Sequence, residues 1–168
     1  MNRLALALVA LLVAAACGPG SPGGPTMNNK MNGGPGPASS MSAVVSTDIL
    51  SREPVANVAT VKHILISWKD LEDSFQGHQD KRAAAREKSQ AEAEVKSLFG
   101  QIKAGGDFEV LMKAHSEDVG SAQSNRAFTV SPDAQLVIEF RQLSLRLNVG
   151  EIGVVQSDFG FHIIKRYE

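Results

Sequence analysis

The last eighteen residues, 151–168, constrain the fold most, because two strand-forming runs flank a turn-forming one. Val154-Val155 and Phe161–Ile164 are rich in β-branched and aromatic residues, which favour strands, while Ser157-Asp158-Phe159-Gly160 favours a tight turn. This pattern predicts a β-hairpin. His162 places a polar imidazole inside the second apolar run, so its nitrogens need internal partners or have a chemical use.

The composition is that of a globular protein without a nucleic-acid-binding surface. Of the 168 residues, 43% are hydrophobic and 21% are charged, which suffices for one ordinary core. The formal net charge of -1 provides no basic surface for phosphate, which argues against a nucleic-acid partner. Because Cys17 is the only cysteine, an internal disulfide is excluded.

Residues 1–17 are predicted to be an export signal that ends in a lipid attachment site. Arg3 precedes an unbroken apolar run, Leu4–Ala16, shorter than the about 20 residues that a membrane-spanning helix needs. Ala14-Ala15-Ala16-Cys17 resembles the lipobox of bacterial lipoproteins, with Ala14 in place of the usual Leu. The resemblance implies that lipid on Cys17 attaches the chain to a membrane. Gly18 at the next position resembles the residue in lipoproteins that are sent to the outer membrane and face the periplasm. Ordinary cleavage that leaves a free thiol is the alternative.

The segment that follows is predicted to be a tether. Residues 18–42 are dominated by Gly, Pro, Ser, Asn and Met, which bury too little apolar surface to offset chain entropy. Residues 44–56 show no clear pattern, so their order stays open. We assign residues 18–56 as a whole to a flexible tether.

Beyond the tether, periodicity predicts strands and helices. In residues 58–68 apolar residues occupy both alternating sets, as in a strand that is buried on both faces. Helix signals are Gly105-Gly106 as a stop, Asp107 as an N-cap and Ser131-Pro132-Asp133 as a start. The elements predicted after the first strand are a charged loop 69–80, a helix 81–103, a short helix 108–114, a polar loop 116–125, a strand 126–130, a helix from 131–133 that ends before Gly150, and the hairpin.

This order of elements predicts an α+β fold, in which a small antiparallel sheet of about four strands has helices packed around it. Residues 57–168 are numerous enough to form one core. The sequence therefore predicts a single domain behind the tether.

Four segments of this domain occur in the order and spacing of the parvulin family of peptidyl-prolyl cis/trans isomerases. They are Val61–Leu65, Gly105–Phe108, Ser116–Ala122 and Gly150–Lys165. The chain resembles secreted, PpiC-like members that are lipid-anchored and assist folding. The resemblance implies a parvulin-like domain that speeds X-Pro isomerisation, with unfolded or partly folded proline-containing exported polypeptides as its partners.

Such a reaction needs neither a cofactor nor a metal. Rotation about a peptide C–N bond faces a barrier of about 18–20 kcal/mol. A thousandfold acceleration requires only about 4 kcal/mol of preference for the twisted amide, which an apolar pocket and a few polar groups supply. The four histidines lack short-spaced thiol or carboxylate partners, so no metal site is predicted.

The resemblance also implies which residues form the site. The polar ones share a hydrogen-bond network around two imidazoles and are His63, Asp118, Ser157 and His162. The apolar ones line a proline pocket and are Phe128, Leu136 and Phe140. Each has a structural alternative: the histidines as core residues that fix the sheet, Asp118 as a turn or cap residue, and the pocket residues as ordinary core.

One stretch departs from the family pattern. Where active relatives carry a Gly-Gly-Asp-Leu-Gly turn, this chain has Asn125–Thr129, in which Arg126 and Thr129 lack the access of glycine to positive φ. We expect a reshaped loop beside the pocket, with consequences for turnover. Two alternatives to an isomerase therefore stay open, namely a non-catalytic binding module or chaperone, and a structural lipoprotein subunit. Phosphate-selective members of the family use a basic cluster in the loop after the first strand. In this chain acidic residues are interleaved with Lys81 and Arg82, so no phosphate requirement is predicted.

Overall fold

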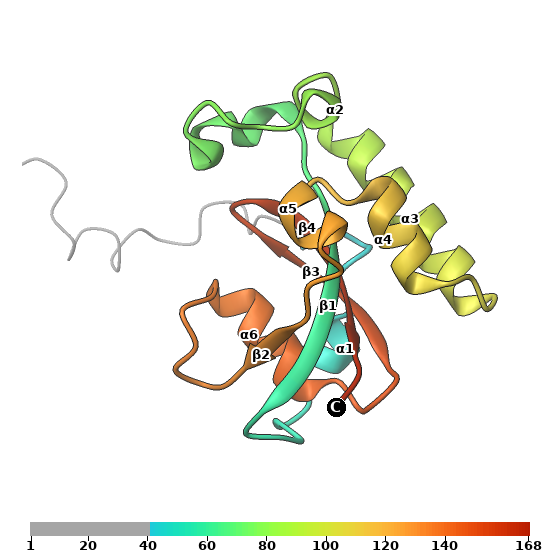
Figure 1. Ribbon diagram of the computed structural model, residues 1–168, viewed down its shortest axis with the longest axis vertical. Helices are drawn as coiled ribbons and strands as arrows, with labels where there is room; N and C mark the ends of the chain where they lie inside the picture. Colours follow the sequence, from blue (N-terminus) through green and yellow to red (C-terminus); the bar gives the residue numbers. More distant parts are fainter. Residues whose placement is uncertain (1–40) are drawn as a thin grey trace, which may run out of the picture. The chain divides into compact units, whose positions relative to one another are not determined.

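The computed structural model describes residues 41–168, which form one unit built on a four-stranded sheet (Figure 1). The predicted signal, most of the tether and Cys17 lie outside the described residues. The elements in chain order are α1 (Thr47–Leu50), β1 (Ala59–Ile66), the 3-10 helix η1 (Lys69–Phe75), α2 (Lys81–Ala84), α3 (Lys88–Lys103), α4 (Phe108–His115), α5 (Val119–Gln123), β2 (Phe128–Val130), α6 (Ile138–Arg146), β3 (Ile152–Ser157) and β4 (Gly160–Arg166).

The sheet is antiparallel throughout, with strand order β2-β1-β4-β3. The predicted α+β fold and the C-terminal hairpin, β3 with β4, are therefore confirmed. β1 joins the hairpin through β4, and Leu65 lies directly opposite His162. Since side chains two residues apart share a face, His63 and His162 are diagonal neighbours on one face of the sheet.

The two faces of the sheet have separate cores. On one face, Ile64, Ile66, Phe161 and Ile163 pack with α3 and α4, which lie together on one side of β1 in Figure 1. On the other face, Val61, Val155 and Ile164 pack against α6. This second face also carries the two imidazoles, so the site shares its face with α6 and not with the longer helices.

The predicted helix 81–103 is wrong as a single element, because the chain leaves the helix at residues 85–87. Glu87 starts a new helix with a capping box, in which it exchanges side-chain to backbone hydrogen bonds with Gln90. The break directs Arg86 to the backbone oxygen of Ser67 at 2.9 Å, at the end of β1. In contrast, the prediction of a helix behind Asp107 is confirmed, since its carboxylate accepts the Val110 N–H at 2.8 Å.

The helix predicted to start at residues 131–133 begins only at Ile138. Ser131 donates its hydroxyl to Asp133 at 2.7 Å, and the Ala134 N–H donates to the Ser131 oxygen, so these residues form turns. Leu136 consequently precedes α6, whereas Phe140 lies on it. Two loops also hold short helices that were not predicted, η1 in residues 69–80 and α5 in residues 116–125.

The predicted tether ends too late at residue 56, because residues 41–56 pack on the domain. The Ser46 N–H donates to the Val154 oxygen at 2.9 Å, which covers part of the outer edge of β3. Val45 and Ile49 are buried, and Arg52 binds Glu151 at 2.9 Å. The apolar side chains of this segment show no helical or strand periodicity, but an otherwise unpaired sheet edge gives them a surface to cover. Within residues 41–168, no helix is both long and apolar enough to cross a membrane.

Candidate functional site

The polar residues predicted for the site lie in one unbroken chain of hydrogen bonds. The Nδ1 atoms of His63 and His162 are 3.1 Å apart. His63 Nε2 lies 3.0 Å from the Asp118 carboxylate, and His162 Nε2 lies 2.8 Å from the Ser157 hydroxyl. The structure therefore brings together all four residues, contributed by β1, the N-cap of α5, β3 and β4.

The partners fix where the protons lie when both imidazoles are neutral. The His63 hydrogen bond holds the pKa of Asp118 well below its ordinary range, so this carboxylate accepts and His63 Nε2 donates. His63 Nδ1 then accepts from the Nδ1–H of His162, whose Nε2 accepts from the Ser157 hydroxyl. Every ring nitrogen of the pair is thereby occupied by a protein partner.

Burial keeps the second imidazole neutral. His162 is 5% exposed, and burial first and the neighbouring His63 second lower its pKa to about 3. The rings of Phe140 and His162 meet edge to face at 5.5 Å, and those of Phe140 and His63 at 5.2 Å. The imidazole pair thus presents a fixed and largely apolar surface next to Phe140.

Asp118 is placed by the two residues before it, which line up along β1. The Leu65 N–H donates to the Ser116 hydroxyl at 3.1 Å, and the Glu117 N–H donates to the Leu65 oxygen at 2.9 Å. Asp118 follows directly and caps α5 by accepting the Ser121 N–H at 3.2 Å. The turn-residue alternative for Asp118 therefore holds alongside its contact with His63.

A buried ion pair, which was not predicted, secures this segment. Glu117 accepts from the Ser67 N–H and from Arg86, both at 2.6 Å, and Arg86 also binds Glu94 at 2.9 Å. Burial raises the pKa of Glu117 against the opposing effects of Ser67 and Arg86. The available signal was the Glu87-x-x-Gln90 capping box, which marks a helix start just after Arg86.

The three predicted pocket residues line one cavity of about 230 Å³ beside the imidazoles. Phe128 meets the edge of His63 at 5.3 Å, and Leu136 lies on the turn before α6. The other lining residues, which were not predicted, are Gln135, Val137 and Phe159. The cavity has the size and the apolar walls that a proline ring needs.

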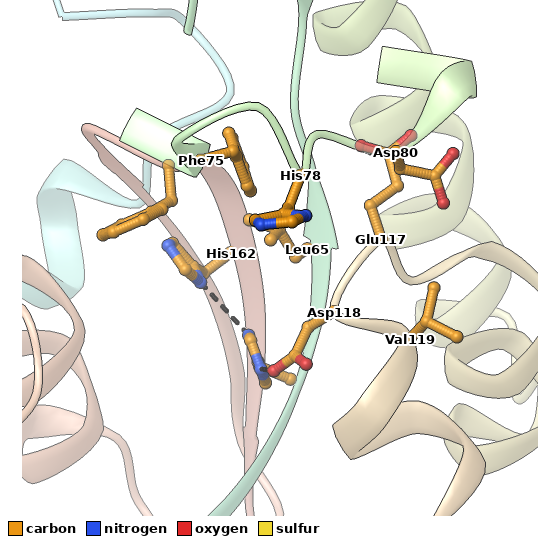
Figure 2. A pocket seen from close by; sticks show the side chains of 10 residues that line it. Leu65, Phe75, His78, Asp80, Glu117, Asp118, Val119 and His162 are labelled. Atoms are coloured by element: carbon orange, nitrogen blue, oxygen red, sulfur yellow. Dashed lines mark hydrogen bonds and ion pairs between the residues drawn. The ribbon is translucent and has the colours of Figure 1, made fainter. Parts of the chain in front are cut away.

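A second cavity of about 470 Å³ adjoins the first and shares His63, Asp118, Phe159 and His162 with it. Figure 2 shows His78, Asp118 and His162 around this space, with Phe75 at its upper side. Phe75 and Phe159, which both line this cavity, contact each other edge to face with ring centroids 5.5 Å apart. His78 and Phe75 carried no predicted role. Within residues 41–168, no three His, Cys, Asp or Glu side chains are grouped as metal ligands.

The turn at residues 125–129 leads into β2, Phe128–Val130. Asn125 takes the left-handed conformation, with φ of 53°, which Asn tolerates better than most residues. Lys62 donates to the Asn125 side-chain oxygen at 3.0 Å and holds this turn to β1. Phe128 still lines the cavity of about 230 Å³, so the departure from the family pattern in this turn leaves that wall in place.

Comparison with known proteins identifies the family. A family model described as the PPIC-type PPIase domain matches residues 47–168. The chain is similar to the foldase protein PrsA of Geobacillus kaustophilus, at 31% identity over 64% of this chain and 38% of that protein. It is also similar to the chaperone SurA of Hahella chejuensis, at 29% identity over 66% of this chain and 23% of that protein. The chain thus spans well under half the length of these relatives.

Solved structures support the fold. The solution structure of TbPIN1 matches with a TM-score of 0.57 and 23% identity, over 68% of this chain and 100% of that one. The peptidyl-prolyl isomerase ESS1 from Candida albicans matches with a TM-score of 0.56 and 19% identity, over 67% of this chain and 63% of that one. Since the family model covers most of the chain, the protein belongs to the parvulin, or PPIC-type, peptidyl-prolyl isomerase domain family.

Proposed function

We propose that the protein accelerates X-Pro isomerisation in unfolded or partly folded exported polypeptides. The observation that carries this proposal is the contact between the apolar cavity of about 230 Å³ and the chain of hydrogen bonds from Asp118 to Ser157. The relatives named as foldase and chaperone support a role in protein folding.

The pocket would act by preferring the twisted amide. A planar amide separates charge through resonance, and the twisted state loses that separation. Apolar walls made by Phe128 and Phe140 therefore favour the twisted state over the planar one, which lowers the barrier without a covalent step. The required preference is about 1.4 kcal/mol for each tenfold gain in rate.

The imidazole pair would act by holding this surface in place. All four ring nitrogens are engaged within the protein, so neither ring has a free N–H for the substrate. His63, Asp118, Ser157 and His162 then fix the position of the rings and the ionised carboxylate beside the amide. The role fits a reaction that needs no nucleophile.

For the location of the protein, we propose a lipid on Cys17 that anchors the chain to the envelope membrane. The support is the lipobox-like segment Ala14–Cys17 behind an apolar run. Residues between Cys17 and the domain would then separate the site from the membrane surface. A Cys17→Ser chain that still partitions fully with membranes would contradict the anchor.

Exchange measurements on the full chain in mild detergent test the activity. Cis and trans populations of an Ala-Pro peptide should interconvert much faster with the protein present than without it. Separate Asp118→Ala and His162→Ala chains should both slow this exchange, and unchanged rates in both would move the active site elsewhere. Binding of the peptide with exchange at the uncatalysed rate would instead support the non-catalytic module, the alternative that the altered turn at 125–129 favours.

A further inference from the structure

We propose that Arg126 makes the site selective for segments that carry an acidic side chain on one side of the proline. This inference rests on the proposed isomerase function and names a substrate class for it. Arg126 lies in the turn where the parvulin pattern has glycines, so it adds a charged side chain that this pattern lacks.

The side chain of Arg126 rests on a wall of the proline pocket. Its guanidinium carbon lies 4.7 Å from the centroid of the Phe128 ring, which lines the cavity of about 230 Å³. A guanidinium stacked on an aromatic face keeps its N–H donors available at its edges. The positive charge is thus held on the ring of a residue that lines the pocket.

The Arg126 charge is available to a substrate. Arg126 is exposed, and within residues 41–168 its guanidinium has neither a carboxylate at ion-pair distance nor a hydrogen-bond acceptor. By contrast, Arg52, Arg82 and Arg86 each bind a carboxylate of the domain. The Arg126 N–H donates to the Ser121 oxygen at 2.9 Å, which anchors the backbone beneath the charge.

Two opposite charges lie near the pocket, with Arg126 on the Phe128 ring and Asp118 in the cavity lining. A proline ring in contact with Phe128 has its neighbours' Cα atoms only about 3.8 Å further along the chain, so an adjacent side chain reaches the guanidinium on that ring. Asp118 also lines the cavity, and its carboxylate would repel an acid placed beside it. An acidic residue is therefore favoured next to Arg126 and disfavoured next to Asp118.

Three peptides of equal length test this selectivity on the full chain in mild detergent. One has Glu directly before the proline, one has Glu directly after it, and one has Gln at both positions. One of the two Glu peptides should exceed the Gln peptide in kcat/KM by about two- to fivefold, the range of an exposed ion pair. The advantage should shrink between about 0.1 M and about 1 M salt, because the Debye length falls from about 10 Å to about 3 Å.

Variants assign the effect to Arg126. Arg126→Gln should remove the advantage, so that the ratio of Glu to Gln peptides falls to about 1. Lys113→Gln is the matched control, because it removes one positive charge from the exposed surface of α4 and should leave the ratio unchanged. The proposal is overturned by an advantage that persists in Arg126→Gln, or by a wild-type chain that favours both Glu peptides or neither.

A failure of the proposed function would look different. The wild-type chain would then leave even the Gln peptide at its uncatalysed rate. The same peptides would be compared by NMR shift titration, and tighter binding of one Glu peptide that requires Arg126 would still support the charge selectivity. Equal binding of all three peptides would overturn it.

Discussion

The two faces of the sheet differ in how completely helices cover them. The face with Ile64, Phe161 and Ile163 is sealed by α3, Lys88–Lys103, together with α4. The opposite face is covered by α6, Ile138–Arg146, which is much shorter, and only over its lower part in Figure 1. This face carries His63 and His162, and both cavities border these two imidazoles.

This difference explains how a small domain stays stable with a polar network in its interior. The face covered by α3 and α4 supplies an apolar core in which the large side chains pack against one another. The other face then carries buried imidazoles, which need hydrogen-bond partners and contribute less apolar packing. Stability is expected to depend mainly on one face, and function on the other.

The largest expected effect separates the two faces directly. Phe161→Ala removes a ring that is 0% exposed and packs against Trp68 at 5.1 Å, which should cost about 3–5 kcal/mol of unfolding free energy. Phe140→Ala removes a ring that borders a cavity open to solvent, so it should cost about 1–2 kcal/mol less. Urea denaturation of the two variants measures this difference.

The same pair should show the reverse order in activity. Phe140→Ala opens the pocket wall and should reduce X-Pro exchange strongly under conditions where it is still folded. Phe161→Ala should retain exchange in proportion to its folded fraction. Equal unfolding costs for the two substitutions, or greater loss of exchange in folded Phe161→Ala, would show that the two faces are not specialised.

The sequence alone predicted the elements whose signals are local. The hairpin of β3 and β4 and the N-cap at Asp107 both depend on neighbouring residues, and both were found. The pairing of His63 with His162 joins residues 99 positions apart, so it came from the resemblance to parvulins and not from any periodicity.

Elements set by distant contacts were missed. Residues 85–87 are good helix formers, but Arg86 leaves the helix to satisfy a buried carboxylate on Glu117. Likewise, Pro132 is a good first residue for a helix, but the Ser131–Asp133 hydrogen bond and the carbonyl of Pro132, which Arg141 binds at 2.6 Å, hold it in a turn. The delayed start of α6 leaves room for the pocket.

A smaller effect on stability is expected from Ser157, the last residue in the chain of hydrogen bonds that starts at Asp118. Ser157→Ala leaves His162 Nε2 buried without its donor, which should cost about 1–3 kcal/mol of unfolding free energy. Ser157→Thr is the matched control, because it keeps the hydroxyl and should cost much less. The ¹⁵N shifts of the His162 ring should change in Ser157→Ala and stay in Ser157→Thr. Identical shifts in all three chains would mean that Ser157 does not set the tautomer.

Over the range from pH 7 to pH 5.5, the smallest expected effect is the pH dependence of stability that His162 contributes. His162 has a folded pKa of about 3, below the about 6.5 of an unfolded histidine, so the unfolded state binds the extra proton between these values. The stability that His162 contributes is complete above pH 6.5 and is lost as the pH falls toward 3, by at most about 1.4 kcal/mol per pH unit. Burial raises the pKa of Glu117, so its contribution to the unfolding free energy falls as the pH rises above the ordinary pKa of a glutamate.

Because these two slopes oppose each other, the test must isolate the imidazole. Unfolding free energies of the wild-type chain and of His162→Gln should be compared between pH 7 and pH 5.5, where the wild type should lose more stability than the variant. NMR gives the same answer without a variant, since the His162 ring resonances of the folded protein should not titrate over this range. If the His162 ring took up a proton between pH 7 and pH 5.5 while the domain stayed folded, the imidazole would tolerate a positive charge in its buried position. The hydrogen-bond network would then not be held in the neutral arrangement inferred from its distances.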